Sequence, residues 1–147
     1  MQIKTNDFDL ESTIESGQIF GFEKLSNNIY ELMVGDSVIK IRQTKDRLYV
    51  DSKSDENLLQ SVRTYFSLDQ DLEPLYSIME KNSVLKPLLK LKGLRIITQD
   101  PWIALGSFII SSNNNIKRIK SIWKNLAENI EKNRYLFPGV KKLAFSS

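Results

Sequence analysis

The chain has 147 residues, of which 41% are hydrophobic and 27% charged, and this length suits one domain or two small ones. It contains no cysteine and no histidine, so it cannot supply a disulfide, a Cys/His metal site, a cysteine nucleophile or a histidine general base. Carboxylates, lysines, hydroxyls and backbone groups remain, and carboxylates alone still allow a Mg²⁺ site.

The chain shows no sign of a membrane segment. No apolar run approaches the roughly 18 residues of a bilayer span, and the N-terminus carries acidic residues where a signal peptide needs an apolar stretch. We therefore expect no membrane partner and a cytoplasmic location, or a nuclear one if the source is eukaryotic.

Charge is distributed unevenly along the chain. The net charge is +3, yet residues 116–147 hold eight basic side chains against two acidic ones, and the first 115 residues hold 13 against 16. Such asymmetry suggests contact with a polyanion near one end, although a lysine-rich helix face is often simply solvated. Both interpretations stay open on charge alone.

The first 50 residues read as an antiparallel meander. Four short β-rich runs are separated by polar turn signals, at Ile19–Lys24, Ile29–Val34, Ser37–Gln43 and Arg47–Val50. Beyond a Ser54/Asp55 cap the apolar spacing becomes helical over residues 58–66. Two shorter helical pieces follow, around residues 72–79 and 85–89, and Gly93 ends the second.

Asp100-Pro101 predicts a helix start, because Asp can cap free backbone N–H groups and proline at the first position has none to lose. The helix over residues 101–110 is apolar on almost every face, so we expect other elements to enclose it. After the polar residues 111–115, an amphipathic helix runs from Ile116 to about Lys132, with lysines on its outer faces.

The polar residues between these two helices are the first candidate site. Asn113, Asn114 and Asn115 each offer an amide acceptor and two donors, which suit a base edge or a phosphate at a helix N-terminus. The alternative is that they merely cap one helix and begin the next.

Three segments resemble the family of 8-oxoguanine DNA glycosylases, in the family's order. Residues 93–101 and 107–119 (GLRIITQDP and SFIISSNNNIKRI) are similar to the family's first helical segment. Residues 16–22 (SGQIFGF) resemble its Ser-Gly-Gln-x-Phe-x-Trp motif, with phenylalanine in the tryptophan place, and residues 62–69 (VRTYFSLD) resemble its Arg-x-Tyr-Phe-x-Leu-Asp stretch.

The resemblance implies an α+β fold. We expect an N-terminal antiparallel β-sheet with flanking helices (TBP-like) over residues 1–92, followed over residues 93–147 by the opening helices of a helical glycosylase domain. It also implies roles for single residues. Asn113 and Arg118 match residues that contact the cytosine left behind by the flipped base, with Asn114 and Asn115 beside them as DNA-binding residues. Gly17 matches the glycine whose carbonyl accepts a hydrogen bond from N7–H of the oxidised guanine, and without the motif it would be an ordinary turn glycine with positive φ.

The family's catalytic parts have no match in this chain. Its hairpin, catalytic lysine and later aspartate correspond to positions beyond residue 147. Residues 137–142 (FPGVKK) resemble the hairpin only superficially, because its second glycine is missing. A nucleophilic lysine needs a desolvated pocket that lowers its pKa, and we do not expect the chain terminus to provide one for Lys141. We therefore expect no catalytic residue, no metal ligand and no cofactor.

The first hypothesis is an N-terminal part of an 8-oxoguanine DNA glycosylase/lyase of base excision repair, which binds double-stranded DNA containing 8-oxoguanine but is inactive alone. The alternative is a stand-alone non-catalytic DNA-binding module, or a subunit completed by a separate C-terminal partner. A small α+β domain with a protein partner is a third hypothesis. If the apolar helix stays exposed, we expect self-association or docking of the missing C-terminal segment.

Overall fold

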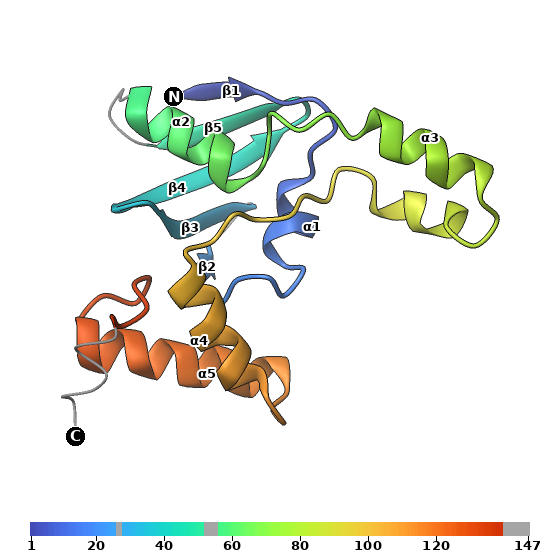
Figure 1. Ribbon diagram of the computed structural model, residues 1–147. Helices are drawn as coiled ribbons and strands as arrows, with labels where there is room; N and C mark the ends of the chain where they lie inside the picture. Colours follow the sequence, from blue (N-terminus) through green and yellow to red (C-terminus); the bar gives the residue numbers. More distant parts are fainter. Residues whose placement is uncertain (26–27, 52–55, 140–147) are drawn as a thin grey trace.

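In the computed structural model, residues 1–25, 28–51 and 56–139 are described, and they form a five-stranded antiparallel sheet with helices (Figure 1). The expected α+β class is confirmed. The strand order is β1-β5-β4-β3-β2, so β1 and β2 are the edges. The strands are β1 (Gln2–Lys4), β2 (Phe22–Lys24), β3 (Ile29–Val34), β4 (Ser37–Thr44) and β5 (Arg47–Asp51).

Helices α1 (Leu10–Ile14) and α2 (Glu56–Tyr65) pack against one face of the sheet. Alternate strand residues point into this layer, among them Leu32, Ile41 and Leu48, which are fully buried. From α2, Val62 joins the same core. The alternate apolar residues of the strands and the helically spaced apolar residues of α2 therefore form one hydrophobic layer.

Three features of the N-terminal part differ from the sequence expectation. Strand β1 and helix α1 were not expected, because both are too short for a clear period. The predicted run from Ile19 pairs in the sheet only from Phe22. Phe20 and Gly21 instead pack against Trp123. The predicted Ser54/Asp55 cap lies outside the described residues.

Helix α3 (Glu73–Lys81) and the 3₁₀ helix η1 (Lys86–Leu91) form a hairpin that projects from the body of the protein (Figure 1). Gly93 follows η1 with φ +92, the left-handed conformation that glycine adopts freely, so the expected helix stop is confirmed. The next residues, 94–99, run in extended form to α4 (Pro101–Ser111).

A buried arginine fixes this extended segment to the N-terminal part. Arg95 is 3% exposed, and no carboxylate pairs with its guanidinium among the hydrogen bonds of the described residues. Its N–H groups donate to four main-chain carbonyls, those of Asn6, Asp7, Ser67 and Gln70. Because these carbonyls come from two separate loops, Arg95 joins them to the start of the helical part.

Helix α4 begins as predicted, with the Asp100 carboxylate accepting from the N–H groups of Trp102 and Ile103 at 2.8 and 3.2 Å. Helix α5 (Ile116–Leu126) then continues into a π-helical turn, η2 (Ala127–Glu131), which the apolar spacing did not reveal. Ile119 and Trp123 are buried, as the amphipathic pattern predicted. In the described part of the chain, every helix is too short or too polar to traverse a lipid bilayer.

One face of α4 is left exposed by the described residues. Leu105, Phe108 and Ile109 are 51%, 72% and 60% exposed, and Ile116 at the start of α5 is 60% exposed. We call these four residues the α4 apolar face. The division of the chain at residue 92 stays a prediction, because residues 94–99 pack with the first part while leading into the helices of the second.

Candidate functional site

The loop between α4 and α5 holds its three asparagines in different ways. Asn113 adopts φ +57, a left-handed conformation that asparagine tolerates better than most residues. Its side chain is exposed and has no hydrogen-bond partner among the described residues. Asn113 is therefore free to bind a ligand from solution.

Asn114 and Asn115 hold the helix ends, as the capping alternative predicted. The Asn114 amide donates to the carbonyls of Ile110 and Ser112, at 2.7 and 3.2 Å. The Asn115 side-chain oxygen accepts from the N–H of Arg118 at 3.0 Å and caps α5. Only the remaining amide groups of these two side chains are left for a partner.

Arg118 and Lys117 lie in the first turn of α5, exposed, and neither side chain has a partner within the described residues. This turn contains no acidic residue. The partial positive charge of a helix N-terminus disfavours cations there, by about 0.3–1 kcal/mol each. Two unneutralised cations at this position therefore destabilise the free protein slightly, and an anionic ligand would reverse the effect.

Gly17 lies in the turn after α1 with φ +89, and a Cβ added there would meet no atom within 4 Å. The positive φ alone therefore explains why glycine occupies this position. The neighbouring Gln18 anchors the turn, because its side chain donates to the carbonyl of Arg95 at 2.9 Å and accepts from the N–H of Ile97 at 2.8 Å. Gln18 thus connects the Gly17 turn to residues 94–99 by hydrogen bonds.

The Gly17 turn runs directly into the surface on which α5 packs. The Trp123 ring lies against Gly21, where an added Cβ would come within 2.3 Å of Cη2. One turn earlier on α5, the Lys120 ammonium lies 4.7 Å from the centre of the Phe22 ring. The fold therefore brings the two predicted contact regions onto neighbouring elements, although they are almost 100 residues apart in sequence.

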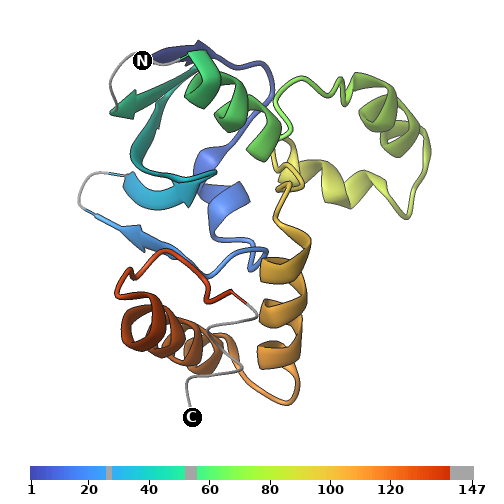
Figure 2. The ribbon, with the colours of Figure 1, turned by 60° about the vertical axis from the view of Figure 1, so that its left-hand side comes forward.

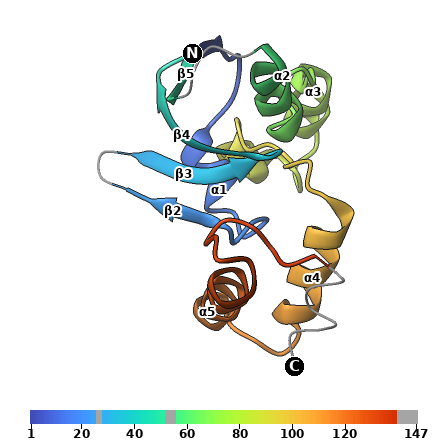
Figure 3. The same cartoon turned by 90° about the vertical axis from the view of Figure 1, so that its left-hand side faces the viewer.

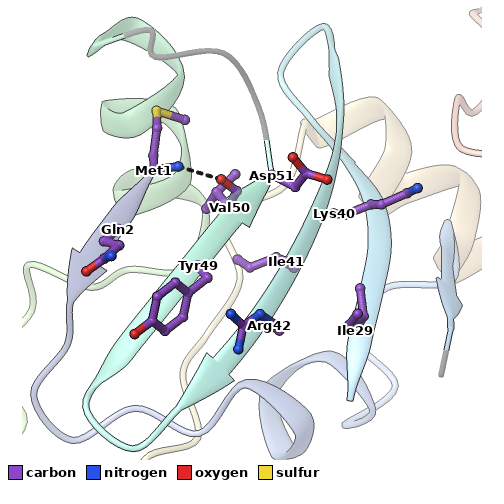
Figure 4. Close-up of a pocket in the computed structure, with 9 residues that line it drawn as sticks. All are labelled: Met1, Gln2, Ile29, Lys40, Ile41, Arg42, Tyr49, Val50 and Asp51. Atoms are coloured by element: carbon purple, nitrogen blue, oxygen red, sulfur yellow. Dashed lines mark hydrogen bonds between the residues drawn. The ribbon is translucent and has the colours of Figure 1, made fainter. Parts of the chain in front are cut away.

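The predicted site residues line neither of two hollows that the described residues form. An apolar cavity of about 200 Å³ lies between residues 19–21, α4 and α5, and its wall includes Tyr65 and Trp123. A larger hollow of about 460 Å³ lies on the outer face of the sheet, where the Arg42 guanidinium stacks 4.3 Å from the Tyr49 ring (Figure 4). In the described residues, no group of three or more acidic side chains is arranged to hold a metal ion.

Three comparisons place this architecture among known proteins. The family model described as 8-oxoguanine DNA glycosylase, N-terminal domain, matches residues 1–105. An N-glycosylase/DNA lyase of Saccharomyces cerevisiae is 29% identical over 143 residues, which cover 88% of this chain and 38% of that protein.

Two solved structures share the fold. MBOgg1 in complex with a low affinity DNA ligand is 32% identical with a TM-score of 0.87, over 97% of this chain and 52% of that one. The Clostridium acetobutylicum 8-oxoguanine glycosylase/lyase, in complex with double-stranded DNA containing cytosine opposite 8-oxoG, is 27% identical with a TM-score of 0.82, over 97% and 55%. The chain thus spans about half the length of these solved proteins and less of the yeast relative.

Proposed function

The chain belongs to the family of 8-oxoguanine DNA glycosylase N-terminal domains, and we propose that it is the N-terminal part of an 8-oxoguanine DNA glycosylase/lyase of base excision repair. In this proposal it binds double-stranded DNA containing 8-oxoguanine and contributes lesion and cytosine recognition. The observation that carries the proposal is the pair Asn113 and Arg118, which flank the α5 cap. Both side chains are exposed and have no partner among the residues that the structure describes.

Asn113 and Arg118 suit an unpaired cytosine. When a base is flipped out of the duplex, its former partner exposes acceptors and a donor on its Watson–Crick edge. A guanidinium supplies donors and a carboxamide supplies both, so together they can replace the lost pairing. Asn114 and Asn115 contribute to this surface mainly by holding the loop, through the bonds described above.

Gly17 suits the lesion itself. The carbonyl of Gly17 accepts no hydrogen bond among those of the described residues. The oxidised guanine carries a proton on N7, whereas guanine has a lone pair there, so one carbonyl acceptor would attract the first and repel the second. The Gln18 anchor would hold this carbonyl in place.

Binding is tested with duplexes carrying an 8-oxoguanine·cytosine pair, at several salt concentrations. Arg118→Ala should weaken binding by about 5- to 150-fold, which corresponds to the 1–3 kcal/mol of a good base contact. Lys86→Ala on η1 removes the same charge far along the chain and serves as the control. An equal loss in both variants, or no salt-dependent binding by the native chain, would overturn the proposal.

The chain is proposed to be inactive alone, without a catalytic lysine or aspartate, and Lys141 lies outside the described residues. Borohydride trapping on 8-oxoguanine DNA should give no covalent adduct with this chain. An adduct would refute the proposed inactivity.

We also propose that the α4 apolar face docks the C-terminal half of the glycosylase, because the solved relatives are about twice as long as this chain. The open reading frame after residue 147 shows whether that half belongs to the same polypeptide or to a separate partner. Phe108→Asp should reduce capture of a separately expressed C-terminal half, whereas Val38→Asp on the sheet should not. Light scattering distinguishes the alternative: a native dimer that Phe108→Asp dissociates would assign the face to self-association instead.

A further inference from the structure

Edge strand β2 carries a like-charged pair with its neighbour. Glu23 of β2 lies directly opposite Glu31 of β3 in the ladder. Carboxylates at such positions repel each other and destabilise the pairing. The pairing is therefore more stable when cations or hydrogen-bond donors offset this repulsion.

The segment after η2 supplies those partners. The Arg134 guanidinium donates to Glu23 Oε2 at 2.5 Å, and the Tyr135 hydroxyl donates to Glu31 Oε2 and lies 3.4 Å from Glu23 Oε2. From the sheet itself, the Lys40 ammonium lies 3.8 Å from the Glu31 carboxylate. Burial and the hydrogen bond to Glu31 raise the pKa of Tyr135, so its hydroxyl remains a donor at neutral pH.

The same strand is held from its other face by α5. Side chains of successive strand residues point to opposite faces, so Phe22, which packs on Tyr30, faces away from Glu23. The contact of Lys120 with Phe22 thus lies across the sheet from Arg134 and Tyr135. Figures 2 and 3 show α5 and the segment after it beside β2. We call Lys120, Arg134 and Tyr135, which contact the two faces of β2, the β2 clamp.

The clamp is tied firmly to the helices. Phe137 is 5% exposed and fits against Gly106 of α4, where an added Cβ would lie 2.5 Å from its ring. The indole N–H of Trp102 donates to the carbonyl of Pro138 at 2.8 Å. Arg134 and Tyr135 therefore transmit the position of α4 and α5 to the sheet.

We propose that Arg134 and Tyr135 are positioning residues that set the geometry between the two DNA contacts, a role that rests on the proposed function. Strand β2 continues from the Gly17 turn, and α5 carries Arg118 one half-turn before Lys120. Contact on one face of β2 leaves α5 free to rock about the strand. Contact on both faces removes that motion and fixes the spacing between lesion reader and cytosine reader.

Spin labels test the positioning without DNA. The chain has no native cysteine, so Asp36→Cys in the β3–β4 turn and Ser121→Cys on α5, both exposed, can be labelled selectively. Pulsed electron resonance should give a narrow distance distribution for the native sequence and a broader or shifted one for Tyr135→Phe. Tyr49→Phe, which removes a hydroxyl without a hydrogen-bond partner among the described residues, is the matched control. Unchanged distributions in Tyr135→Phe and Glu31→Gln, with folding verified by circular dichroism, would overturn the proposal.

Binding then tests the consequence. Tyr135→Phe should weaken binding to the 8-oxoguanine·cytosine duplex about five-fold, as expected for one hydrogen bond. In the Tyr135→Phe background, Arg118→Ala should cost less than it does alone, because the two residues act together. Strict additivity would refute the coupling. Failure of the native chain to bind would instead sink the proposed function, while the distance measurement would still decide whether the clamp positions α5.

Discussion

Gly21→Ala is the sharpest test of how α5 meets the sheet. The new Cβ would lie 2.3, 2.8 and 3.0 Å from Cη2, Cζ2 and Cζ3 of Trp123. Ordinary contacts between carbon atoms are about 3.5–4.0 Å, so at least one contact overlaps by more than about 1 Å. Trp123 is 2% exposed and packs on Phe137 with ring centres 5.8 Å apart, so it has little room to retreat.

Overpacking of this kind costs about 1–3 kcal/mol. With a urea m-value of about 2 kcal/mol per M, a loss of about 2 kcal/mol lowers the unfolding midpoint by about 1 M. Gly139→Ala is the control, because a Cβ there meets nothing within 4 Å, and its midpoint should stay unchanged.

A second-site change separates the clash from other effects. Trp123→Phe removes the six-membered-ring atoms that would collide with the new methyl group. Although Trp123→Phe is itself destabilising, the double variant should be more stable than the sum of the single changes predicts, by about 1 kcal/mol. A Gly21→Ala midpoint equal to or above that of the native chain would refute the packing described here.

Three further predictions concern stability and the loop. Arg95→Lys should lower the free energy of unfolding by about 2–3 kcal/mol in urea, because one ammonium cannot replace the guanidinium bonds to four carbonyls; a change below about 0.5 kcal/mol would contradict this. The Lys24 ammonium, followed by the Tyr30 hydroxyl, lowers the pKa of Glu15 from its ordinary 4.5. The ionised Glu15 carboxylate therefore stabilises the fold above pH 4.5, and this contribution is lost as the pH falls through the pKa of Glu15 in the folded state. Glu15→Gln should therefore reduce the loss of stability at acid pH. An unchanged acid side of the curve of stability against pH would contradict this assignment. Asn114→Ala should lower the melting temperature by about 2–4 °C, because its hydrogen bonds at the helix end are lost. Asn113→Gly keeps the left-handed backbone, so it should leave the melting temperature unchanged and weaken DNA binding. The reverse pattern would exchange the roles of the two asparagines.

Local patterns in the sequence predict the elements that depend on near neighbours. Alternation over residues 29–50 predicts the central strands, and Asp100-Pro101 predicts the start of α4, because each signal acts within one turn or one strand. The polar break at residues 111–115 likewise marks the loop between α4 and α5. The asparagine run did not reveal which side chain stays free, since capping and exposure depend on the backbone angles of each residue.

Only the tertiary structure decided which distant residues share a surface. Nothing in the spacing of Glu23 and Glu31 indicates that Arg134 forms an ion pair with the first and Tyr135 donates a hydrogen bond to the second, from more than 100 residues later. Nor does the sequence show that Gly21 is glycine because Trp123 covers it. Periodicity reports on neighbours two to four positions apart, whereas these contacts arise from the path that the folded chain takes between them. The sequence by itself therefore determined the family resemblance and the local elements, and the fold determined how the elements that carry the two candidate contact regions pack against each other.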